Sequence, residues 1–213
     1  MQLHSYFRSS ASYRVRIALN LKGQAYSTVP VHLLNHGGEQ HAPAFAAINP
    51  EQLVPVLTDG DLVLTQSLAI LEYLEERFPE PALLPRDVGV RALVRSLALE
   101  IACDIHPINN LRVLRYLKRE LHVSDEDKDR WYRHWIAVGF DALEQRLSRL
   151  VGGAFCVGDQ PTFADICLVP QVFNARRFAI DMTAYPRIVA VEARCLEIEA
   201  FASAAPDRQV DAA

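Results

Sequence analysis

Three serines, Ser9, Ser10 and Ser12, lie where a predicted strand passes into a predicted helix. Alternating residues over 2–6 predict the strand, and apolar residues at helical spacing over 15–21 predict the helix. The first turn of a helix has unpaired N–H groups and a partial positive charge, and serine hydroxyls add hydrogen-bond donors. Such a place suits an anion, for example a thiolate. The alternative is that the serines only cap the helix, and the local sequence by itself favours that interpretation.

Two further segments carry groups suited to a peptide-like ligand. Val54-Pro55 begins a predicted strand, and a cis bond there would leave the backbone of Val54 free to pair with such a ligand. An ordinary strand start explains this pair equally well. Gln66 and Ser67 open a predicted helix directly after a strand, so the helix end and the hydroxyl could bind a carboxylate. The simpler alternative is a plain helix cap, with Ser67 as the capping residue.

A third polar group surrounds Pro107, where a helix predicted over 88–121 is expected to kink. Its members are His106, Asn109, Asn110 and Arg112. Arg8 and the pair Arg176-Arg177 add cations, and the planar fork of an arginine matches a carboxylate. We therefore expect several of these side chains to converge on one cleft. Surface ion pairs are the alternative, above all for Arg176.

Composition argues against several classes of protein and site. The 213 residues are 50% hydrophobic and carry a formal net charge of −4, which argues against a nucleic-acid or anionic-membrane surface. No apolar run approaches the roughly 20 residues of a membrane span, and the N-terminus lacks a signal-peptide pattern. The 4 cysteines are widely spaced, as expected for reduced thiols in the cytoplasm. His32, His36 and His41 share a loop without cysteine or carboxylate ligands at matching spacing, so no metal site is expected.

The elements that must position these residues change in type along the chain. The first eighty residues predict the order β-α-β-α-β-β-α, with a hairpin around Gly60, and thus a small mixed sheet with helices packed on it. Beyond three closely spaced prolines only helices are predicted. The sequence therefore predicts an α/β domain over 1–80, a linker over 81–89 and an all-helical domain over 90–213. The tail 204–213 is small and polar and is expected to be frayed.

Two helix starts in the predicted all-helical domain carry cap signals. Ser124 precedes a helix that contains two tryptophans, and Thr162 is followed three positions later by Asp165. The second spacing is that of a capping box, with Asp in place of the usual Glu or Gln.

The serine-rich run Ser9–Leu19 resembles the signature of the zeta-class glutathione transferases, a family that includes maleylacetoacetate and maleylpyruvate isomerases. Later segments resemble family segments in the same order: Leu53–Pro55, Thr65–Ile70, Asp104–Asn110 and Pro170–Phe178. The resemblance covers nearly the whole chain. It implies a thioredoxin-like N-terminal domain, an all-helical C-terminal domain, a glutathione site in the cleft between them, and a homodimer.

The resemblance also implies roles for individual residues. Ser9, with Ser10 beside it, would activate the sulfur of glutathione. The residues that would bind its cysteine backbone, its γ-glutamyl carboxylate and its glycine end are, in that order, Val54, the pair Gln66 and Ser67, and His41. The residues that would face a small dicarboxylic keto-acid substrate are Arg8, His106, Asn110, Arg112 and Arg177. Among these, Arg8, His106 and Arg112 join the two serines as the implied catalytic residues.

The activity implied is glutathione-dependent cis–trans isomerisation. A thiolate adds to one alkene carbon, the resulting single bond rotates, and loss of the thiolate leaves the trans isomer. Animal and plant members have cysteine where this chain has Ala11, so a protein thiol at that position cannot be essential here. Maleylacetoacetate, from tyrosine and phenylalanine breakdown, is the first substrate expected, and maleylpyruvate, from gentisate breakdown, is the second. Conjugation or dehalogenation of small α-halo acids would use the same thiolate, and a non-catalytic glutathione-binding module is the reading that involves no reaction.

Overall fold

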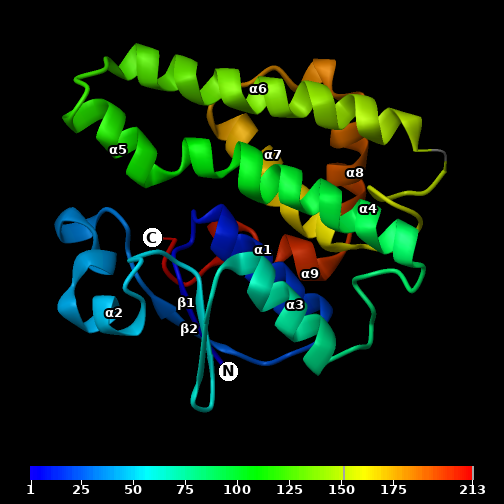
Figure 1. Cartoon of the computed structure of the whole chain (residues 1–213), viewed down its shortest axis with the longest axis horizontal. Coiled ribbons are helices and arrows are strands. Elements are labelled where there is room, and N and C mark those ends of the chain that lie inside the picture. Colours follow the sequence, from blue (N-terminus) through cyan, green and yellow to red (C-terminus); the bar gives the residue numbers. More distant parts are fainter. Residues whose placement is uncertain (151, 213) are drawn as a thin grey trace. The chain divides into compact units, whose positions relative to one another are not determined.

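The structure is a computed structural model that describes residues 1–150 and 152–212, which form two compact units (Figure 1). The first unit joins Met1–Ala82 with the stretch that begins at Leu196, and the second comprises Leu83–Cys195. The sequence assigned this C-terminal stretch to the helical domain. It groups instead with the N-terminal residues, because its apolar side chains and backbone groups contact the first helix and the turn before it.

The first unit is a 4-stranded sheet with helices packed against it. Its elements are β1 (Gln2–Ser5), α1 (Ser10–Leu21), β2 (Ser27–Pro30), α2 (Pro43–Ile48), β3 (Val56–Asp59), β4 (Leu62–Thr65), α3 (Ser67–Arg77) and α9 (Glu199–Ala202). The strand order is β2-β1-β3-β4, with β1 and β2 parallel and the other pairs antiparallel. The predicted element order and the thioredoxin-like α/β class are confirmed.

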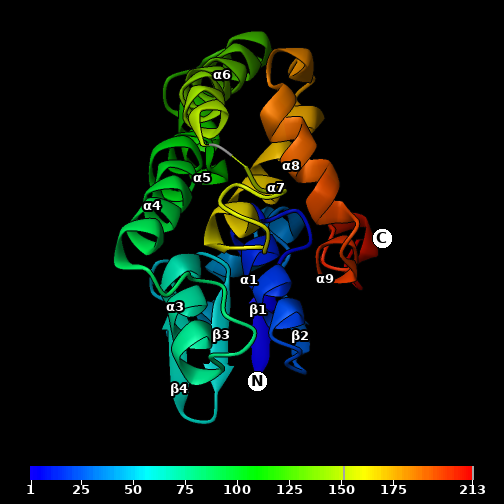
Figure 2. The same cartoon turned by 90° about the vertical axis from the view of Figure 1, so that its right-hand side faces the viewer.

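Apolar residues at strand and helix spacing form the core of this unit. Leu3 of β1 lies opposite Leu57 of β3, and both are fully buried, as are Ile17 of α1 and Ile70 of α3. Figures 1 and 2 show α1 and α3 packed side by side. The hairpin between β3 and β4 turns at Gly60, whose φ of 58° lies in the left-handed region that such a short loop requires. The sheet thus places the starts of α1 and α3 in one packed unit.

The C-terminal stretch is a structural part of the first unit. Phe201 of α9 and the following Ala204 are buried, and Ala212 packs against the apolar cluster that contains Phe7. The hydroxyl of Tyr13 donates to the carbonyl of Phe201, 188 residues further along the chain, at 3.4 Å. The expectation of a frayed tail is therefore wrong for residues 204–212, because small residues there are fixed by partners that are remote in sequence.

The second unit is helical. Its helices are α4 (Val88–Leu99), α5 (Leu111–Arg119), α6 (Asp125–Arg149), α7 (Phe163–Arg177) and α8 (Pro186–Leu196). The helix expected over 88–121 consists of α4 and α5, separated by a π-helical segment (Glu100–Ile105) and a 3-10 turn (Pro107–Asn109). The segment from α4 through the π-helical segment to α5 runs alongside α6 (Figure 1). Ser124 caps α6 as predicted, since its Oγ accepts from the N–H of Asp127 at 3.0 Å.

Two local features shape α6 and the start of α7. Gly139 of α6 faces Ile105, and a Cβ added at this glycine would overlap the isoleucine side chain. At the start of α7 the N–H and the hydroxyl of Thr162 both donate to Asp165 at 2.8 Å, and the N–H of Cys156 donates to it at 2.7 Å. Burial raises the pKa of Asp165, while these donors oppose the rise. The predicted capping box is confirmed.

Candidate functional site

The serine-rich turn forms the N-terminus of α1. Ser9 occupies the cap position, where its Oγ accepts a hydrogen bond from the N–H of Ser12 at 3.2 Å. Its own N–H donates to the carbonyl of Tyr6 at 2.9 Å. The cap that the local sequence favoured is therefore present. A hydroxyl that accepts through a lone pair keeps its proton, so the partly exposed Ser9 can still donate to an anion. Ser10, the first helical residue, is buried.

Two charged side chains hold the peptide groups of Phe7, just before this turn. Nη2 of Arg16 donates to the Phe7 carbonyl at 3.0 Å, and the Asp211 carboxylate accepts from the Phe7 N–H at 2.9 Å. Arg16 also donates to Oγ of Ser5 at 3.1 Å and to the carbonyl of Ala204 at 2.9 Å. Burial lowers the pKa of Arg16 to about 10, which leaves it charged at neutral pH. The long-range contacts could not be predicted from the sequence, because Asp211 lies 204 residues from Phe7 and Ala204 lies 188 residues from Arg16.

The N-terminus of α3 differs from that of α1 because no side chain caps it. The expectation that Ser67 is the cap is wrong: Gln66 occupies that position with a φ of 66°, and its Nε2 donates to the Glu51 carboxylate at 3.1 Å. Ser67 is the first helical residue, and Nη1 of the buried Arg14 donates to its Oγ at 3.2 Å. The first N–H groups of a helix have no acceptor within it, and a strained residue beside them is typical of ligand sites. This end of α3 therefore fits a carboxylate.

The Val54-Pro55 bond is cis, as one of the two sequence interpretations allowed. The ladder between β1 and β3 begins at Val56, so Val54 lies just outside it. His41 belongs to the same region, since its Nδ1 lies 2.5 Å from Oε1 of Gln52. The residues expected at the cysteine backbone and at the glycine end of glutathione are thus close to one another in the first unit.

The polar group around Pro107 separates into structural and exposed members. Asn109 is buried, and its Nδ2 donates to the carbonyl of Tyr132 at 3.3 Å. Asn110 caps α5, with its Oδ1 accepting from the N–H of Arg112 at 3.1 Å. The side chain of Arg112 is exposed in the first turn of α5. The sequence did not decide whether Asn109 or Asn110 faces the expected cleft. Asn110 is the one that lies beside an exposed cation, Arg112.

The two arginines at the end of α7 differ in their environment. Arg176 forms an ion pair with Glu192, with Nε 3.2 Å from Oε1, so the ion-pair interpretation is confirmed for this residue. The Arg177 guanidinium lies 5.0 Å from the ring centre of Phe178, whose ring stacks on Tyr132 at 3.5 Å. Burial raises the pKa of Tyr132 to about 12, although its hydrogen bond with Arg177 opposes the rise. The exposed guanidinium of Arg177 therefore lies against an aromatic pair, which it contacts through Phe178.

Arg8 is the substrate-side candidate of the first unit. It is exposed, and its guanidinium lies 4.9 Å from the ring centre of Phe7, the residue held by Arg16 and Asp211. The other substrate-side candidates, His106, Asn110, Arg112 and Arg177, belong to the second unit. Convergence of Arg8 with these residues on one substrate stays a prediction.

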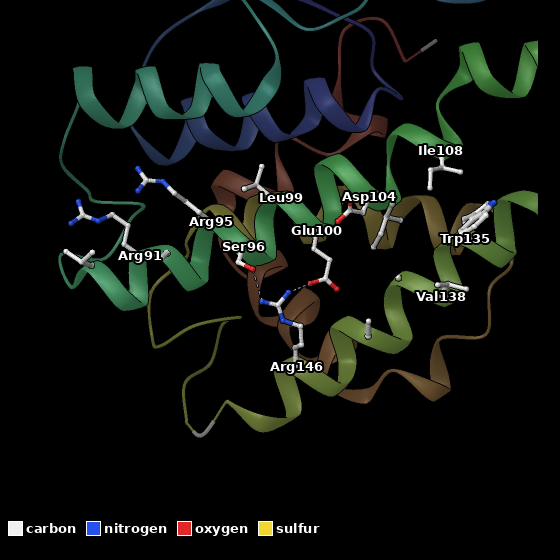
Figure 3. A pocket seen from close by; sticks show the side chains of 15 residues that line it. Arg91, Arg95, Ser96, Leu99, Glu100, Asp104, Ile108, Trp135, Val138 and Arg146 are labelled. Atoms are coloured by element: carbon white, nitrogen blue, oxygen red, sulfur yellow. Dashed lines mark hydrogen bonds and ion pairs between the residues drawn. The ribbon is translucent and has the colours of Figure 1, made fainter.

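An open pocket of about 1070 Å³, which was not predicted from the sequence, lies between α4, the π-helical segment and α6 (Figure 3). Within it Arg146 of α6 forms an ion pair with Glu100. Leu99 of α4 and Val138 of α6 line the pocket and are each 47% exposed. The feature of the sequence that could have indicated this pocket is a row of apolar residues on α4 in addition to its buried row. The additional row includes the strongly exposed Val88.

All cysteines of the chain lie in the second unit, and its described residues show no group of metal ligands. The first unit contains no cysteine, and Ala11 stands in the serine-rich turn. In the second unit Cys103 is exposed, whereas Cys156 is buried and burial raises its pKa. Among the described residues there is no cluster of three or more His, Cys, Asp or Glu side chains able to hold a metal ion. The same residues include no helix with the length and hydropathy of a membrane span.

Comparison with known proteins identifies the family. The model of the glutathione S-transferase N-terminal domain matches residues 3–82, and that of the C-terminal domain matches residues 136–194. A Vibrio cholerae protein named probable maleylacetoacetate isomerase is 55% identical over 210 residues, which cover 99% of this chain and 97% of that protein. The chain belongs to the glutathione S-transferase family. The maleylpyruvate isomerase of a Ralstonia species is 51% identical to it over 215 residues, covering 100% of both proteins.

Solved structures place the chain within this family. A holo structure of maleyl pyruvate isomerase, described as a bacterial zeta-class glutathione S-transferase, matches with a TM-score of 0.97 at 50% identity and covers 100% of both chains. Maleylacetoacetate isomerase from Methylobacterium extorquens AM1, with bound malonate and GSH, matches with a TM-score of 0.96 at 43% identity and the same coverage. The zeta-class resemblance and the transferase fold expected from the sequence are confirmed.

We predict that Ser9→Ala lowers the free energy of unfolding by about 1 kcal/mol, because the N–H of Ser12 loses its side-chain acceptor. Urea denaturation of the purified protein measures the change. Ser9→Asn is the matched control: it keeps an acceptor at the cap position and should remain near the wild-type value. Equal losses in the two variants would show that the cap bond is not what Ser9 contributes to stability.

Proposed function

We propose that this protein is a glutathione-dependent cis–trans isomerase that converts maleylacetoacetate to fumarylacetoacetate. The observation that carries the proposal is the pair of helix N-termini in the first unit, at Ser9 and at Ser67. Glutathione has two anionic groups to match them, its thiolate and its γ-glutamyl carboxylate, and a helix N-terminus suits either. Relatives named maleylacetoacetate isomerase and maleylpyruvate isomerase support this class of reaction.

The start of α1 suits the sulfur. A free cysteine-type thiol has a pKa near 8.5, so the site must favour its ionised form at neutral pH. Ser9 can do so because its Oγ already accepts from the N–H of Ser12, which leaves its proton for the thiolate. Ser10 stands next to it as the first residue of the helix. The partial positive charge of the helix end acts in the same direction.

The start of α3 suits the γ-glutamyl carboxylate. Its first N–H groups lack a side-chain cap, and the hydroxyl of Ser67 is the first side chain of the helix. Gln66 is exposed beside it. We assign the cysteine backbone of glutathione to Val54 and its glycine end to His41, because Val54 lies just outside the β1–β3 ladder and His41 contacts Gln52, two positions before Val54. An extended peptide next to β3 would pair by backbone hydrogen bonds.

When bound, glutathione supplies the thiolate whose addition to one alkene carbon makes the cis bond single, so that it can rotate before the thiolate leaves and the trans double bond forms again. The chain's own residues must hold the substrate carboxylates and stabilise the negative charge that develops on its keto oxygen. We assign these tasks to Arg8, Arg112, Arg177, His106 and Asn110. Arginine forks match carboxylates in two parallel bonds, and preorganised donors lower the barrier where charge develops.

Maleylpyruvate is the second candidate substrate. It is favoured by the 51% identity to the Ralstonia maleylpyruvate isomerase and by the TM-score of 0.97 with the holo structure of such an enzyme. The two substrates share the maleyl end and differ in the length of the acyl chain, so the same thiolate chemistry applies to both.

We predict that the purified protein isomerises maleylacetoacetate, and maleylpyruvate more slowly, only when glutathione is present. The reason is that neither Ala11 nor any other residue of the first unit offers a thiol. Ultraviolet spectroscopy follows the loss of the cis isomer for each substrate with and without glutathione. Equal rates without glutathione would contradict the mechanism, and a higher specificity constant for maleylpyruvate would reverse the order of substrates.

We predict that Ser9→Ala lowers kcat by about 100- to 1000-fold, the usual effect of removing one donor to a developing or stable anion. The pKa of bound glutathione should rise toward about 8.5, so the rate profile should shift to higher pH. Ultraviolet thiolate absorbance, titrated in parallel with the rate, measures the shift. Ser10→Ala is the comparison: if it produces the larger shift, Ser10 is the activating residue.

We also propose that the protein works as a homodimer in the cytoplasm. The pocket face of the second unit supports the dimer, because Leu99 and Val138 are each 47% exposed around it and Val88 is 73% exposed. Exposed apolar patches of this kind are typical of surfaces that a second molecule covers. The widely spaced cysteines, without a disulfide framework, support a reducing compartment.

We predict that the double variant Leu99→Glu/Val138→Glu is a monomer, because two carboxylates on this face would be desolvated in a dimer. Size-exclusion chromatography with light scattering gives the mass. The control is Leu121→Glu, which changes a leucine that is 57% exposed outside the pocket and should leave the mass unchanged. A wild-type protein that is monomeric, or a double variant that still dimerises, would rule out this interface.

A further inference from the structure

Two arginines of α1 are buried to a similar degree but face different parts of the first unit. Arg14 is 1% exposed and Arg16 is 0% exposed. Arg16 bonds Oγ of Ser5 and the carbonyls of Phe7 and Ala204, which are structural partners in the loop and the C-terminal stretch. Arg14 instead reaches across to α3, where its Nη1 donates to Oγ of Ser67 at 3.2 Å. Only Arg14 is therefore directed at a residue of the proposed glutathione site.

The bond from Arg14 determines what the Ser67 hydroxyl can do. A hydroxyl has one proton and two lone pairs, so a hydroxyl that accepts from a guanidinium keeps its proton for another acceptor. Donation from a charged group also polarises the hydroxyl and makes it a stronger donor. Ser67 is 8% exposed at the uncapped start of α3, so its remaining surface lies at that helix end.

The charge of Arg14 acts at the same place. Coulomb interactions are screened much less inside a protein than in water, so a buried guanidinium one hydrogen bond behind the helix end attracts an anion there. It adds to the partial positive charge of the first turn. A buried charge is often no more stabilising than an apolar side chain of the same volume. Packing alone therefore does not explain why an arginine is buried at position 14, whereas a role in ligand binding does.

We propose that Arg14 is a positioning residue for the γ-glutamyl carboxylate of glutathione, acting through Ser67 rather than by touching the ligand. This inference rests on the proposed function, which assigns that carboxylate to the start of α3. It makes α1 serve both ends of the ligand: its first turn holds the sulfur, and its buried face orients the hydroxyl that holds the carboxylate.

The test compares glutathione with 4-aminobutanoyl-cysteinyl-glycine, which is glutathione without the γ-glutamyl carboxylate. Calorimetry gives the dissociation constant of each ligand for the wild type and for Arg14→Met. We expect the wild type to prefer glutathione by about 10- to 100-fold, the range of a charge-assisted hydrogen bond. We expect Arg14→Met to weaken glutathione by a similar factor and to leave the affinity for the decarboxylated ligand unchanged.

Arg16→Met is the matched control, because it removes an equally buried guanidinium from the same helix. It should lower the melting temperature without changing the ratio of the two dissociation constants. If Arg14→Met weakens both ligands equally, Arg14 has only a structural role and the inference is overturned. If the wild type binds both ligands equally, the carboxylate is not held at Ser67, and the inference fails while glutathione dependence stands. If the wild type binds neither, the proposed function fails as well.

A second pair of variants covers the case in which Arg14→Met does not fold. Arg14→Lys keeps the charge but loses the planar fork, and we expect the KM for glutathione to rise more than kcat changes. In the Ser67→Ala background the same Arg14→Lys change should have no further effect on the ligand ratio, because the hydroxyl that it orients is absent. Additive effects of the two substitutions would contradict action through Ser67.

Discussion

Burial of two guanidinium groups in one short helix is the constraint on which the first unit depends. Removing an ion from water costs several kcal/mol unless hydrogen bonds replace its hydration, and the pKa of Arg16, lowered to about 10, reflects this cost. The Arg16 guanidinium replaces its hydration with hydrogen bonds to groups of β1, of the loop before Ser9 and of the C-terminal stretch. The turn that carries Ser9 is therefore fixed only when the two ends of the chain have come together.

The two helix starts in this unit share one arrangement and differ in one respect. In both, a serine hydroxyl accepts a hydrogen bond from within the fold, which leaves its proton available to another acceptor: Ser9 accepts from a neutral backbone N–H, and Ser67 accepts from a buried guanidinium. A charged donor polarises the hydroxyl more strongly than a neutral one. In the proposed function the stronger arrangement serves a carboxylate, which stays ionised throughout, and the weaker one serves a thiolate, which must be able to leave as well as to attack.

Features that depend on nearby residues could be predicted from the sequence. The hairpin at Gly60, the caps at Ser124 and Thr162 and the serine-rich helix start all follow from spacing within a few positions. The contacts of the C-terminal stretch could not be predicted, because a small polar tail gives no periodic signal and its partners lie about as far away in the sequence as the chain allows. The cap at α3 was assigned to Ser67 rather than Gln66 because sequence preference does not reveal a left-handed φ.

The residues that the proposed function assigns to glutathione and to the substrate differ in burial, and this bears on how relatives come to have different substrates. Ser9, Ser67 and Val54 belong to the packed sheet unit, where a shift of one disturbs buried neighbours. Arg112 and Arg177 are exposed side chains of the helical unit, in the first turn of α5 and the last turn of α7. Proteins named for maleylacetoacetate and for maleylpyruvate are similarly close to this chain, at 55% and 51% identity. Under the proposed function, a shared thiolate chemistry with a variable substrate end accounts for that similarity, because a longer or shorter acyl chain would meet the exposed arginines and not the buried residues assigned to glutathione.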